Sequence, residues 1–505
     1  MQTHLQTPQQ AAAWLRERVT GQLQTDHRKL HAGDGFIAMP GLSVDARKFV
    51  PQALHDGAAA CLVDAQDVPL WDLDEARVAS YTRLKNDSAQ IAAAFYEQPS
   101  RSVQVLAVTG TNGKTSSVWW LSQALNALGS QPTCALIGTL GIGVASAGEI
   151  GLSGLSPSGM TTPDSVLLQS SLRSFVDQGL DYCALEASSI GIEEGRMDAT
   201  RVRLAVFTNF TQDHLDYHGT MQAYWAAKRR LFAWPGLQAA VVNSDDDQGA
   251  VLATELAAQA PEIDLWTVST HLAARIQASD IEQGALGLQF SVREGQQRCL
   301  LRTRIIGGYN VSNLLGVIAS LRALGVDLAT AVQACANLPP VPGRLQCLGG
   351  QDGPLAVVDY AHTPDALQKT LDVLRPLAQQ RGGALWCVFG CGGDRDSAKR
   401  PRMGAIAASK ADHIVLTSDN PRMENPASII SHILAGMGGQ PHIQVQADRA
   451  LAISESLTHA GTKDVVLIAG KGHEAAQEVA GQKFIFSDVD HADIALALRA
   501  QRQAA

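Results

Sequence analysis

Short apolar runs alternate with stretches of helical spacing along most of the chain, and many of these runs end in polar, glycine-rich segments. A short apolar run bounded by turn residues is typical of a buried strand, and strands that alternate with helices favour a mostly parallel sheet. The pattern therefore predicts an α/β fold. The predicted strands are residues 103–108, 182–186, 204–209, 239–243 and 265–268, followed by 355–359, 384–389, 413–417 and 465–469.

The same pattern indicates where the chain divides. Residues 1–99 mix short strand signals with helical stretches, and Pro99 precedes the first long apolar run. Residues 338–344 contain three prolines and a glycine, which interrupt any helix or central strand. A chain of 505 residues has room for about two to four domains. We expect boundaries near residues 99 and 342.

The first long apolar run leads into the glycine-rich segment 109–116, and helical spacing follows over 117–128. A strand, a tight turn and a helix in this order place backbone N–H groups and a helix N-terminus around a phosphate. Lys114 would neutralise the β- and γ-phosphates, and the Thr115 hydroxyl would hold Mg²⁺. The loop is a shorter variant of the common P-loop. A chance glycine turn is the alternative, but the order of elements favours ATP binding.

Other polar groups near strand ends are suited to a metal ion. Glu186 ends the strand 182–186, where a carboxylate can hold Mg²⁺; an ordinary surface glutamate is the alternative. His214, in a segment dense in oxygen and imidazole groups, is the candidate ligand of a second metal ion. Lys228 by itself is typical of the solvated face of an amphipathic helix.

Three polar loops follow predicted strands in the last part of the chain: 390–396, 418–422 and 470–474. Ligands of a doubly wound sheet bind outside the carboxyl ends of its strands, so we expect these loops to meet in one crevice. Asn310 is a candidate N-cap, and either Asn310 or Asn313 could hydrogen-bond an adenine edge. Residues 359–365 could close over the nucleotide.

Composition narrows the class of protein. The chain is 46% hydrophobic and 18% charged, as expected for a globular protein, and its net charge of −9 disfavours nucleic-acid binding. The eight cysteines form no CxxC pair, which favours reduced thiols in the cytoplasm, and Cys387 and Cys391 have no further metal ligands near them in sequence. We find no signal peptide and no apolar span, and so expect no membrane insertion.

Together, these motifs resemble those of the Mur ligase family. The matching segments are 109–115, 186–189, 213–218, 309–313 and 359–362, while 419–422 and 470–474 resemble the members that add the third residue of the peptide. The resemblance spans nearly the whole chain and is weakest in the first domain. It implies a UDP-MurNAc-substrate-binding domain (1–99), a central ATP-binding domain (100–342) and a C-terminal Rossmann-like amino-acid-binding domain (343–505).

The resemblance also implies a reaction. The expected enzyme is an ATP-dependent amide ligase that adds meso-2,6-diaminopimelate to UDP-N-acetylmuramoyl-L-alanyl-D-glutamate during peptidoglycan precursor synthesis. The D-glutamyl carboxylate attacks the γ-phosphate of ATP, and the amine then displaces phosphate from the acyl phosphate. Mg²⁺ would be the metal cofactor. We expect a cytoplasmic monomer that binds these small molecules and neither nucleic acid nor membrane.

The resemblance assigns residues to each site. The expected nucleotide contacts are Gly110, Thr111, Asn112, Gly113, Lys114, Thr115, Ser116, Asn310, Asn313, Arg344, Asp359 and His362. The expected metal ligands are Thr115, Glu186, His214 and Lys228 as a carbamate, and Lys114, His214 and Lys228 are the expected catalytic residues. The UDP-MurNAc dipeptide is assigned to Thr161, Thr162, Ser188, Glu194 and Arg196. Diaminopimelate is assigned to Arg395, Asp419, Asn420, Pro421, Arg422, Gly470 and Glu474.

Arg422 is the residue expected to select meso-diaminopimelate over L-lysine. meso-Diaminopimelate differs from L-lysine by a second carboxylate, which a planar guanidinium can bind through paired hydrogen bonds. A surface salt bridge is the alternative role for Arg422. Three positions depart from the family pattern. The family usually has serine where this chain has His27 and histidine where it has Ile190, and it often has glutamine where this chain has Glu194. We expect these departures to alter individual contacts to the UDP substrate.

Other functions explain these sequence features less well. A lysine-adding ligase is disfavoured by Arg422, and a folylpolyglutamate-type ligase by the recognisable N-terminal domain. A nucleotide-binding regulatory protein that has lost turnover is disfavoured by the presence of Lys114, Glu186, His214 and Lys228. A structural scaffold would explain none of the loop chemistry.

Overall fold

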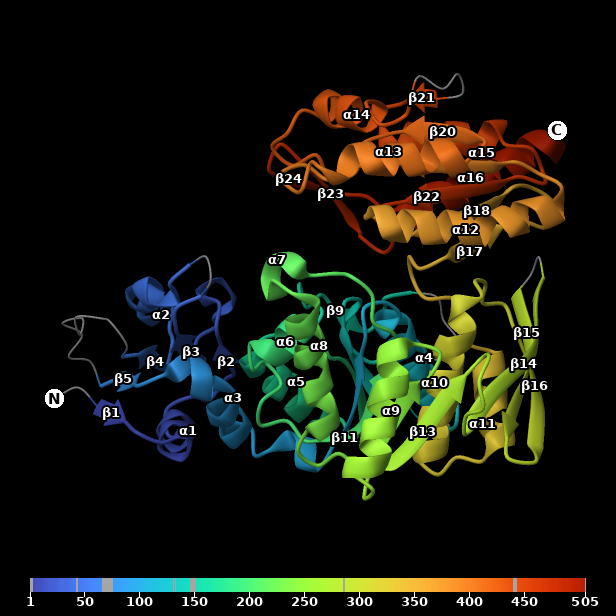
Figure 1. Ribbon diagram of the computed structural model, residues 1–505. Helices are drawn as coiled ribbons and strands as arrows, with labels where there is room; N and C mark the ends of the chain where they lie inside the picture. Colours follow the sequence, from blue (N-terminus) through green and yellow to red (C-terminus); the bar gives the residue numbers. More distant parts are fainter. Residues whose placement is uncertain are drawn as a thin grey trace. The chain divides into compact units, whose positions relative to one another are not determined.

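In this computed structural model, residues 3–41, 44–65, 76–129, 131, 133–145, 151–284, 287–438 and 443–504 are described (Figure 1). Their strands form three large sheets and one hairpin, which confirms the predicted α/β class. The chain divides into two compact units, residues 1–278, 292–298 and 312–335, and residues 279–291, 299–311 and 336–505. No helix within the described ranges is both long and apolar enough to cross a bilayer.

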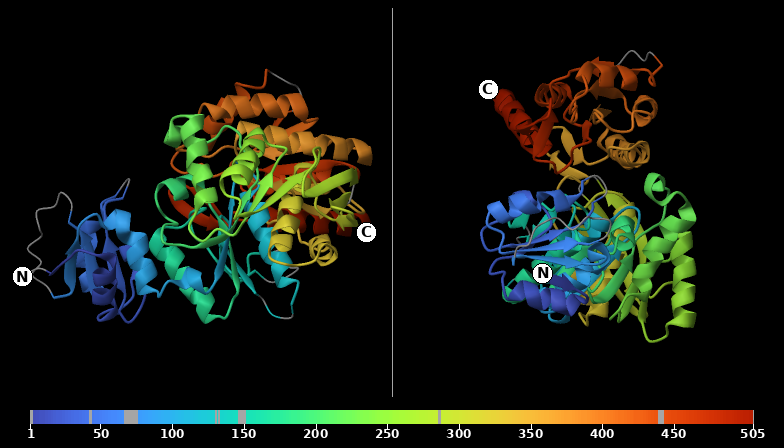
Figure 2. Two further views of the ribbon diagram at one scale, coloured as in Figure 1. Left: turned by 60° about the horizontal axis from the view of Figure 1, so that its bottom comes forward. Right: turned by 90° about the vertical axis from the view of Figure 1, so that its left-hand side faces the viewer.

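The N-terminal part of the first unit is a five-stranded sheet with helices on both faces (Figure 2). Its elements are β1 (Thr3–Leu5), α1 (Pro8–Arg16), β2 (Leu23–Gln24), β3 (Gly35–Ala38), α2 (Val50–His55), β4 (Ala60–Asp64), β5 (Val78–Tyr81) and α3 (Leu84–Phe95). The strands are parallel, in the order β1-β5-β4-β3-β2. Because successive strand residues point to opposite faces, Ile37 packs with α1 and α3 whereas Phe36 packs with α2.

The central sheet has eleven strands in the order β16-β15-β14-β13-β12-β11-β6-β10-β7-β8-β9. Its strands are β6 (Gln104–Thr109), β7 (Cys134–Gly138), β8 (Gly141–Gly143), β9 (Leu155–Ser156), β10 (Tyr182–Glu186), β11 (Val202–Phe207), β12 (Ala239–Asn243), β13 (Asp264–Ser269), β14 (Ile276–Gly284), β15 (Gly287–Glu294) and β16 (Gln297–Thr303). The helices of this part of the chain are α4 (Lys114–Asn126), α5 (Ser165–Asp177), α6 (Ser189–Glu193), α7 (Leu215–His218), α8 (Met221–Arg229), α9 (Asp247–Gln259), α10 (Tyr309–Ala323) and α11 (Leu328–Ala336).

The register of the central strands places the predicted phosphate loop beside the other candidate groups. β6 pairs in parallel with β10 on one side and β11 on the other, with Val108 opposite Glu186 and Thr109 opposite Phe207. The carboxyl ends of these three strands therefore lie at the same edge of the sheet. The helix after the loop begins at Lys114, three residues earlier than its spacing suggested.

The last sheet belongs to the second unit and has the order β17-β18-β22-β19-β20-β21. Its strands and the adjacent hairpin are β17 (Gln346–Gly349), β18 (Leu355–Asp359), β19 (Leu385–Phe389), β20 (His413–Leu416), β21 (Ile443–Val445), β22 (Val465–Ala469), β23 (Ala476–Val479) and β24 (Gln482–Ile485). The helices are α12 (Pro364–Arg381), α13 (Lys399–Lys410), α14 (Pro426–Leu434), α15 (Arg449–His459) and α16 (Asp488–Ala504). Val357 packs with α12 and α13 on one face, and Val358 packs with α15 and α16 on the other.

Candidate functional site

The glycine-rich loop joins β6 to α4 in the middle of the central sheet. Gly110 and Gly113 have φ values of +148° and +85°, and a β-carbon at either would collide with a neighbour, Thr208 at the first and Asn313 at the second. The Thr208 hydroxyl also donates to the carbonyl of Asn112 (2.6 Å). The glycines thus allow a tightly packed loop at the N-terminus of α4, an arrangement that binds phosphate.

Two lysines converge on one carbonyl oxygen of this loop. Nζ of Lys114 donates to the carbonyl of Gly110 (2.9 Å), and Nζ of Lys228 donates to the same oxygen (2.7 Å). Lys114 also donates to the carbonyl of Thr111 (2.9 Å). An anion that accepts hydrogen bonds from both amines would be held directly over the loop.

Lys228 is buried, with 1% of its surface exposed, so its interpretation as part of a solvated helix face is wrong. Its Nζ lies 4.6 Å from the ring centre of Tyr224, on the same helix. Burial, reinforced by the positive charge of Lys114, holds the pKa of Lys228 well below its usual value. A lowered pKa increases the share of neutral amine, which is the nucleophilic form.

Glu186 lies at the end of β10 with its carboxylate buried at the first turn of α4. Its Oε2 accepts from the Thr115 hydroxyl (3.0 Å), and its Oε1 accepts from the backbone N–H of Thr139 (2.7 Å). A carboxylate and a hydroxyl at hydrogen-bond distance, next to a phosphate loop, are oxygen ligands of the kind that Mg²⁺ prefers. These residues fit a divalent cation.

His214 lies beyond β11, in the left-handed conformation (φ +51°) that begins α7. Burial lowers the pKa of His214, Asp213 opposes this effect and the charge of Lys114 adds to it, which favours the neutral imidazole that can coordinate a metal. Within the described ranges, no three His, Cys, Asp or Glu side chains are grouped to hold a metal ion. A second metal ion here would therefore need at least one ligand other than these side chains, and a modified Lys228 is one candidate.

The residues expected to bind the UDP-linked substrate are connected to Glu186. The Thr162 hydroxyl donates to the carbonyl of Glu186 (2.7 Å) and lies 2.9 Å from the Ser188 hydroxyl. Arg196 donates to the carbonyl of Thr162 (3.0 Å), and the hydroxyl of Thr161 lies 3.2 Å from that of Thr139. These groups form one hydrogen-bonded network with the candidate metal ligand Glu186.

The departures from the family pattern have partners of their own. Glu194 accepts from the Tyr217 hydroxyl (2.6 Å) and pairs with the Lys85 ammonium on α3 (3.0 Å). The Tyr217 hydrogen bond lowers the pKa of Glu194, and Lys85 adds to this effect against the opposing effect of burial. His27 stacks on Phe49, with ring centres 3.9 Å apart. Glu194 thus carries a charge that glutamine would not, and Lys85 offsets it.

Four expected nucleotide contacts lie in the second unit. The Arg344 guanidinium sits 4.6 Å from the ring centre of Tyr360, and Nδ1 of His362 lies 2.9 Å from the Tyr360 carbonyl. Asp359 is buried and accepts from the N–H of Leu345 (2.8 Å), and burial raises its pKa. The amide of Asn310 donates to the Ile306 carbonyl (2.8 Å), and α10 begins at Tyr309, so the predicted N-cap role of Asn310 is wrong.

The three polar loops of the second unit meet, as predicted, because β22, β19 and β20 are neighbours in its sheet. The N–H of Gly393 donates to the carbonyl of Asn420 (2.9 Å), and the Asn420 amide donates to Oε2 of Glu474 (2.8 Å). Gly470 (φ +119°) lies so close to Asp419 that a β-carbon would overlap its carboxylate. Six of the seven residues assigned to the amino acid belong to this contact network: Asp419, Asn420, Pro421, Arg422, Gly470 and Glu474.

Arg395 is exposed in its loop, whereas Arg422 is held by contacts of both its backbone and its side chain. Its guanidinium donates to the carbonyl of Gly393 (2.7 Å) and lies 3.5 Å from Oε2 of Glu478. Its backbone N–H donates to the Glu478 carbonyl on β23 (3.0 Å). The side chain is 25% exposed, which leaves donors of the guanidinium accessible to a ligand.

Sequence reasoning missed two buried cations that support these loops. Arg449 and Asp488 form a fully buried ion pair (2.6 Å), and Arg449 also donates to the carbonyls of Ser418 and Ala469, where two of the loops begin. Lys471 is fully buried next to Glu474 (2.8 Å). Both residues are charged positions near strand ends, but nothing in their local sequence distinguishes them from exposed ones.

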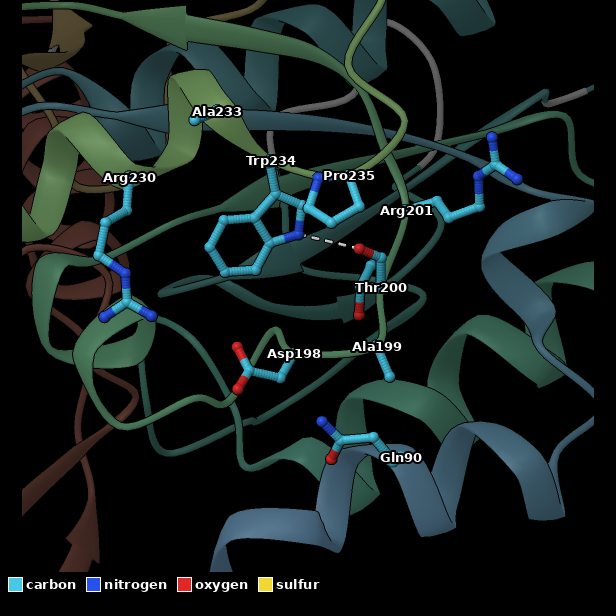
Figure 3. A pocket seen from close by; sticks show the side chains of 9 residues that line it. All are labelled: Gln90, Asp198, Ala199, Thr200, Arg201, Arg230, Ala233, Trp234 and Pro235. Atoms are coloured by element: carbon cyan, nitrogen blue, oxygen red, sulfur yellow. Dashed lines mark hydrogen bonds between the residues drawn. The ribbon is translucent and has the colours of Figure 1, made fainter. Parts of the chain in front are cut away.

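A pocket of about 480 Å³ lies elsewhere in the first unit (Figure 3). It is lined by Gln90 of α3, by residues 198–201 and by residues around Trp234, whose indole donates to the Thr200 carbonyl (2.9 Å). Residues 198–201 precede β11, whereas the phosphate loop follows the parallel strand β6. The pocket is therefore at the opposite edge of the sheet from the candidate site.

Comparisons with known proteins agree with this geometry. Residues 108–321 match the Mur ligase middle domain, and residues 343–472 match the Mur ligase, glutamate ligase domain. Two curated relatives are named UDP-N-acetylmuramoyl-L-alanyl-D-glutamate–2,6-diaminopimelate ligase. The one from Acidovorax sp. (strain JS42) is 55% identical over 98% of both chains, and the one from Pseudomonas aeruginosa is 41% identical over 95% of this chain and 96% of the relative. A solved structure with the same name has a TM-score of 0.66 and 33% identity, covering 95% of both chains.

Proposed function

This chain belongs to the Mur ligase family, in the group of the 2,6-diaminopimelate ligases, and we propose that it joins meso-diaminopimelate to UDP-N-acetylmuramoyl-L-alanyl-D-glutamate with hydrolysis of ATP to ADP and phosphate. The observation that carries the proposal is the convergence of Lys114 and Lys228 on the Gly110 carbonyl, beside the buried Glu186. Lys114 supplies a positive charge there, and Glu186 and a modified Lys228 would supply oxygen ligands for a cation, so the cluster can hold a triphosphate and a carboxylate close together.

The reaction requires two steps. The D-glutamyl carboxylate attacks the γ-phosphorus of ATP, the bond to ADP breaks, and an acyl phosphate forms. The free amine of diaminopimelate then attacks the acyl carbon, phosphate leaves, and the amine loses a proton. The first step brings two anions together, and the second builds negative charge on the acyl oxygen and the leaving phosphate, so positive charge over the phosphate loop should lower both barriers.

Different residues of the central domain would bind the phosphates, hold the metal ions and supply the carbamate. The backbone N–H groups of 110–116 and the Lys114 ammonium bind the phosphates and hold the γ-phosphate for attack. Thr115 and Glu186 would hold one Mg²⁺ and His214 would serve a second, and the bound ions would neutralise phosphate charge as Lewis acids. The neutral Lys228 amine adds to carbon dioxide with release of a proton, and the resulting carbamate supplies a carboxylate where the free lysine has none.

The remaining assignments follow the contact networks. Thr161, Thr162, Ser188, Glu194 and Arg196 bind the UDP-linked dipeptide next to Glu186, and the network around Asn420, Arg422 and Glu474 binds the amino acid. Asn313 is a proposed nucleotide contact of the unit that carries the phosphate loop, and Asn310, Arg344, Asp359 and His362 are proposed nucleotide contacts of the second unit. We place the domain boundaries near residues 99 and 342 and infer a cytoplasmic monomer, in keeping with eight free cysteines.

Phosphate release tests the proposal. Purified protein is given ATP, Mg²⁺ and UDP-N-acetylmuramoyl-L-alanyl-D-glutamate, with meso-diaminopimelate or L-lysine in parallel reactions. We expect turnover with diaminopimelate and little with lysine. Turnover with lysine would keep the ligase and contradict the carboxylate clamp. Absence of turnover with both, in protein that binds ATP, would contradict the proposed reaction.

Replacing Arg422 by alanine should raise KM for meso-diaminopimelate about 10- to 100-fold, because the paired hydrogen bonds to the distal carboxylate are lost. We expect kcat to change little, since this contact is remote from the bond being formed. Arg402→Ala removes an exposed arginine of α13 and is the matched control. Steady-state kinetics with each substrate varied would measure both constants, and an unchanged KM would exclude the clamp.

A further inference from the structure

Lys471 is a fully buried lysine whose ammonium has every hydrogen bond it can make. Nζ donates to Oδ1 of Asn420 (3.0 Å), to Oε2 of Glu474 (2.8 Å) and to the carbonyl of Ala476 (2.6 Å). A lysine ammonium has three N–H groups, so none is left for a ligand. Lys471 can act on a substrate only through these neighbours.

The first neighbour is Asn420, whose amide is fixed in one orientation. Its Oδ1 accepts from Lys471 and from the backbone N–H of Glu478 (3.0 Å). Its Nδ2 donates to Oε2 of Glu474 (2.8 Å). Rotation of the amide by 180° would turn its N–H groups towards the Lys471 ammonium and the Glu478 N–H, so the observed orientation is strongly favoured.

The second neighbour is Glu474, whose two oxygens have different surroundings. Oε2 accepts from both Lys471 and Asn420. In the part of the chain that the structure describes, no group donates to Oε1, although the side chain is only 32% exposed. One oxygen of this carboxylate is thus committed to the protein and the other is available.

We infer that Lys471 is a positioning residue of the amino-acid site, which fixes Asn420 and Glu474 so that Oε1 of Glu474 receives an ammonium group of the incoming amino acid. The inference rests on the proposed function. It adds to that function a residue that touches no substrate and yet sets the geometry and charge of the group that does.

The charges around Glu474 indicate why a buried lysine is needed. His473 and Arg449 are the other basic groups that act on it. Burial and the charge of Arg344 lower the pKa of His473 to about 4, so it is neutral, and Arg449 is already paired with Asp488. Tyr360 also faces Glu474, and burial raises its pKa, so it is neutral as well. Lys471 is therefore the cation that keeps the half-buried carboxylate ionised.

Lys471→Met tests this role. We expect KM for meso-diaminopimelate to rise about 10- to 100-fold, with KM for ATP and for the UDP-linked dipeptide changed less than about two-fold. Because burial favours the protonated form of Glu474 once Lys471 is gone, KM of the variant should also rise further as the pH is lowered. Lys471→Arg, which keeps the charge, should restore part of the affinity. Lys369→Met, a lysine paired only within its own exposed helix turn, is the matched control.

A double-mutant cycle separates positioning from general stability. If Lys471 acts through Glu474, adding Lys471→Met to Glu474→Gln should raise KM no further. Fully additive effects, or an equal rise in all three KM values, would overturn the inference. Should Lys471→Met not fold, Lys471→Gln supplies the same uncharged comparison. Wild-type protein inactive with diaminopimelate would instead contradict the proposed function, and the inference with it.

Discussion

Lys114→Ala should reduce kcat for phosphate release by about 10³-fold, the size of effect expected when one preorganised positive group is removed from a phosphoryl-transfer site. The ammonium donates to the loop carbonyls of Gly110 and Thr111, so in the proposed nucleotide site its charge would lie beside the γ-phosphate as the bond to ADP breaks. Because this charge acts most strongly when the leaving group becomes more negative, the loss should fall on kcat more than on KM for ATP.

Single-turnover measurements at saturating ATP would isolate this effect. Lys114→Arg keeps the charge with a different shape and should retain more activity than the alanine variant. A rise in KM for ATP with unchanged kcat would indicate that Lys114 binds the ground state and transition state equally. Near-normal kcat in the alanine variant would rule out its catalytic role.

Lys228→Ala should reduce kcat by about 10²- to 10³-fold, because it removes the amine from which the proposed carbamate forms. The buried environment that lowers the pKa of Lys228 is the physical reason to expect the modification. Formate or acetate added to the alanine variant should restore part of kcat by supplying a carboxylate to the vacated space. Wild-type protein equilibrated with ¹³C-labelled bicarbonate should show a carbamate carbon by NMR that the variant lacks.

Arg229→Ala is the matched control for this experiment. Arg229 is the next residue of α8, but its side chain is 48% exposed and pairs with Glu255 at the surface (2.8 Å). We expect its activity to stay within about two-fold of wild type, as for most surface ion pairs. Equal loss in both variants would point to damage to α8, and a carbamate signal without any rescue by added carboxylate would leave the modification outside catalysis.

Local spacing was sufficient to predict the strands and the phosphate loop, because each depends on residues adjacent in sequence. β10 and β12 lie where the apolar runs placed them, and the loop lies between β6 and α4. The resemblance to Mur ligases is confirmed by the relatives. The same local reasoning failed for Lys228, which is buried by contact with a loop 118 residues away. A different signal was present, since Lys114 and Lys228 are the only lysines between residues 100 and 342.

Other features could not be predicted because they arise from contacts between distant segments. Lys471 lies between two glycines, where a turn with an exposed lysine is the ordinary expectation, yet it is fully buried by Asn420 and Glu474. The orientation of the Asn420 amide depends on β23, which follows it by more than fifty residues in the chain. The predicted N-cap role of Asn310 was wrong because capping preferences locate a helix start only to within a residue or two, and α10 begins at Tyr309.

At Arg422, the requirement for stability conflicts with the requirement for the proposed choice of substrate. Its φ of +51° lies in the left-handed region, where a residue with a β-carbon costs about 1 kcal/mol or more relative to glycine. Glycine or asparagine at this position would relieve this strain and would remove the guanidinium that we propose distinguishes diaminopimelate from lysine. Selection for stability alone would therefore favour replacing this arginine, whereas selection for the proposed choice of amino acid would keep it.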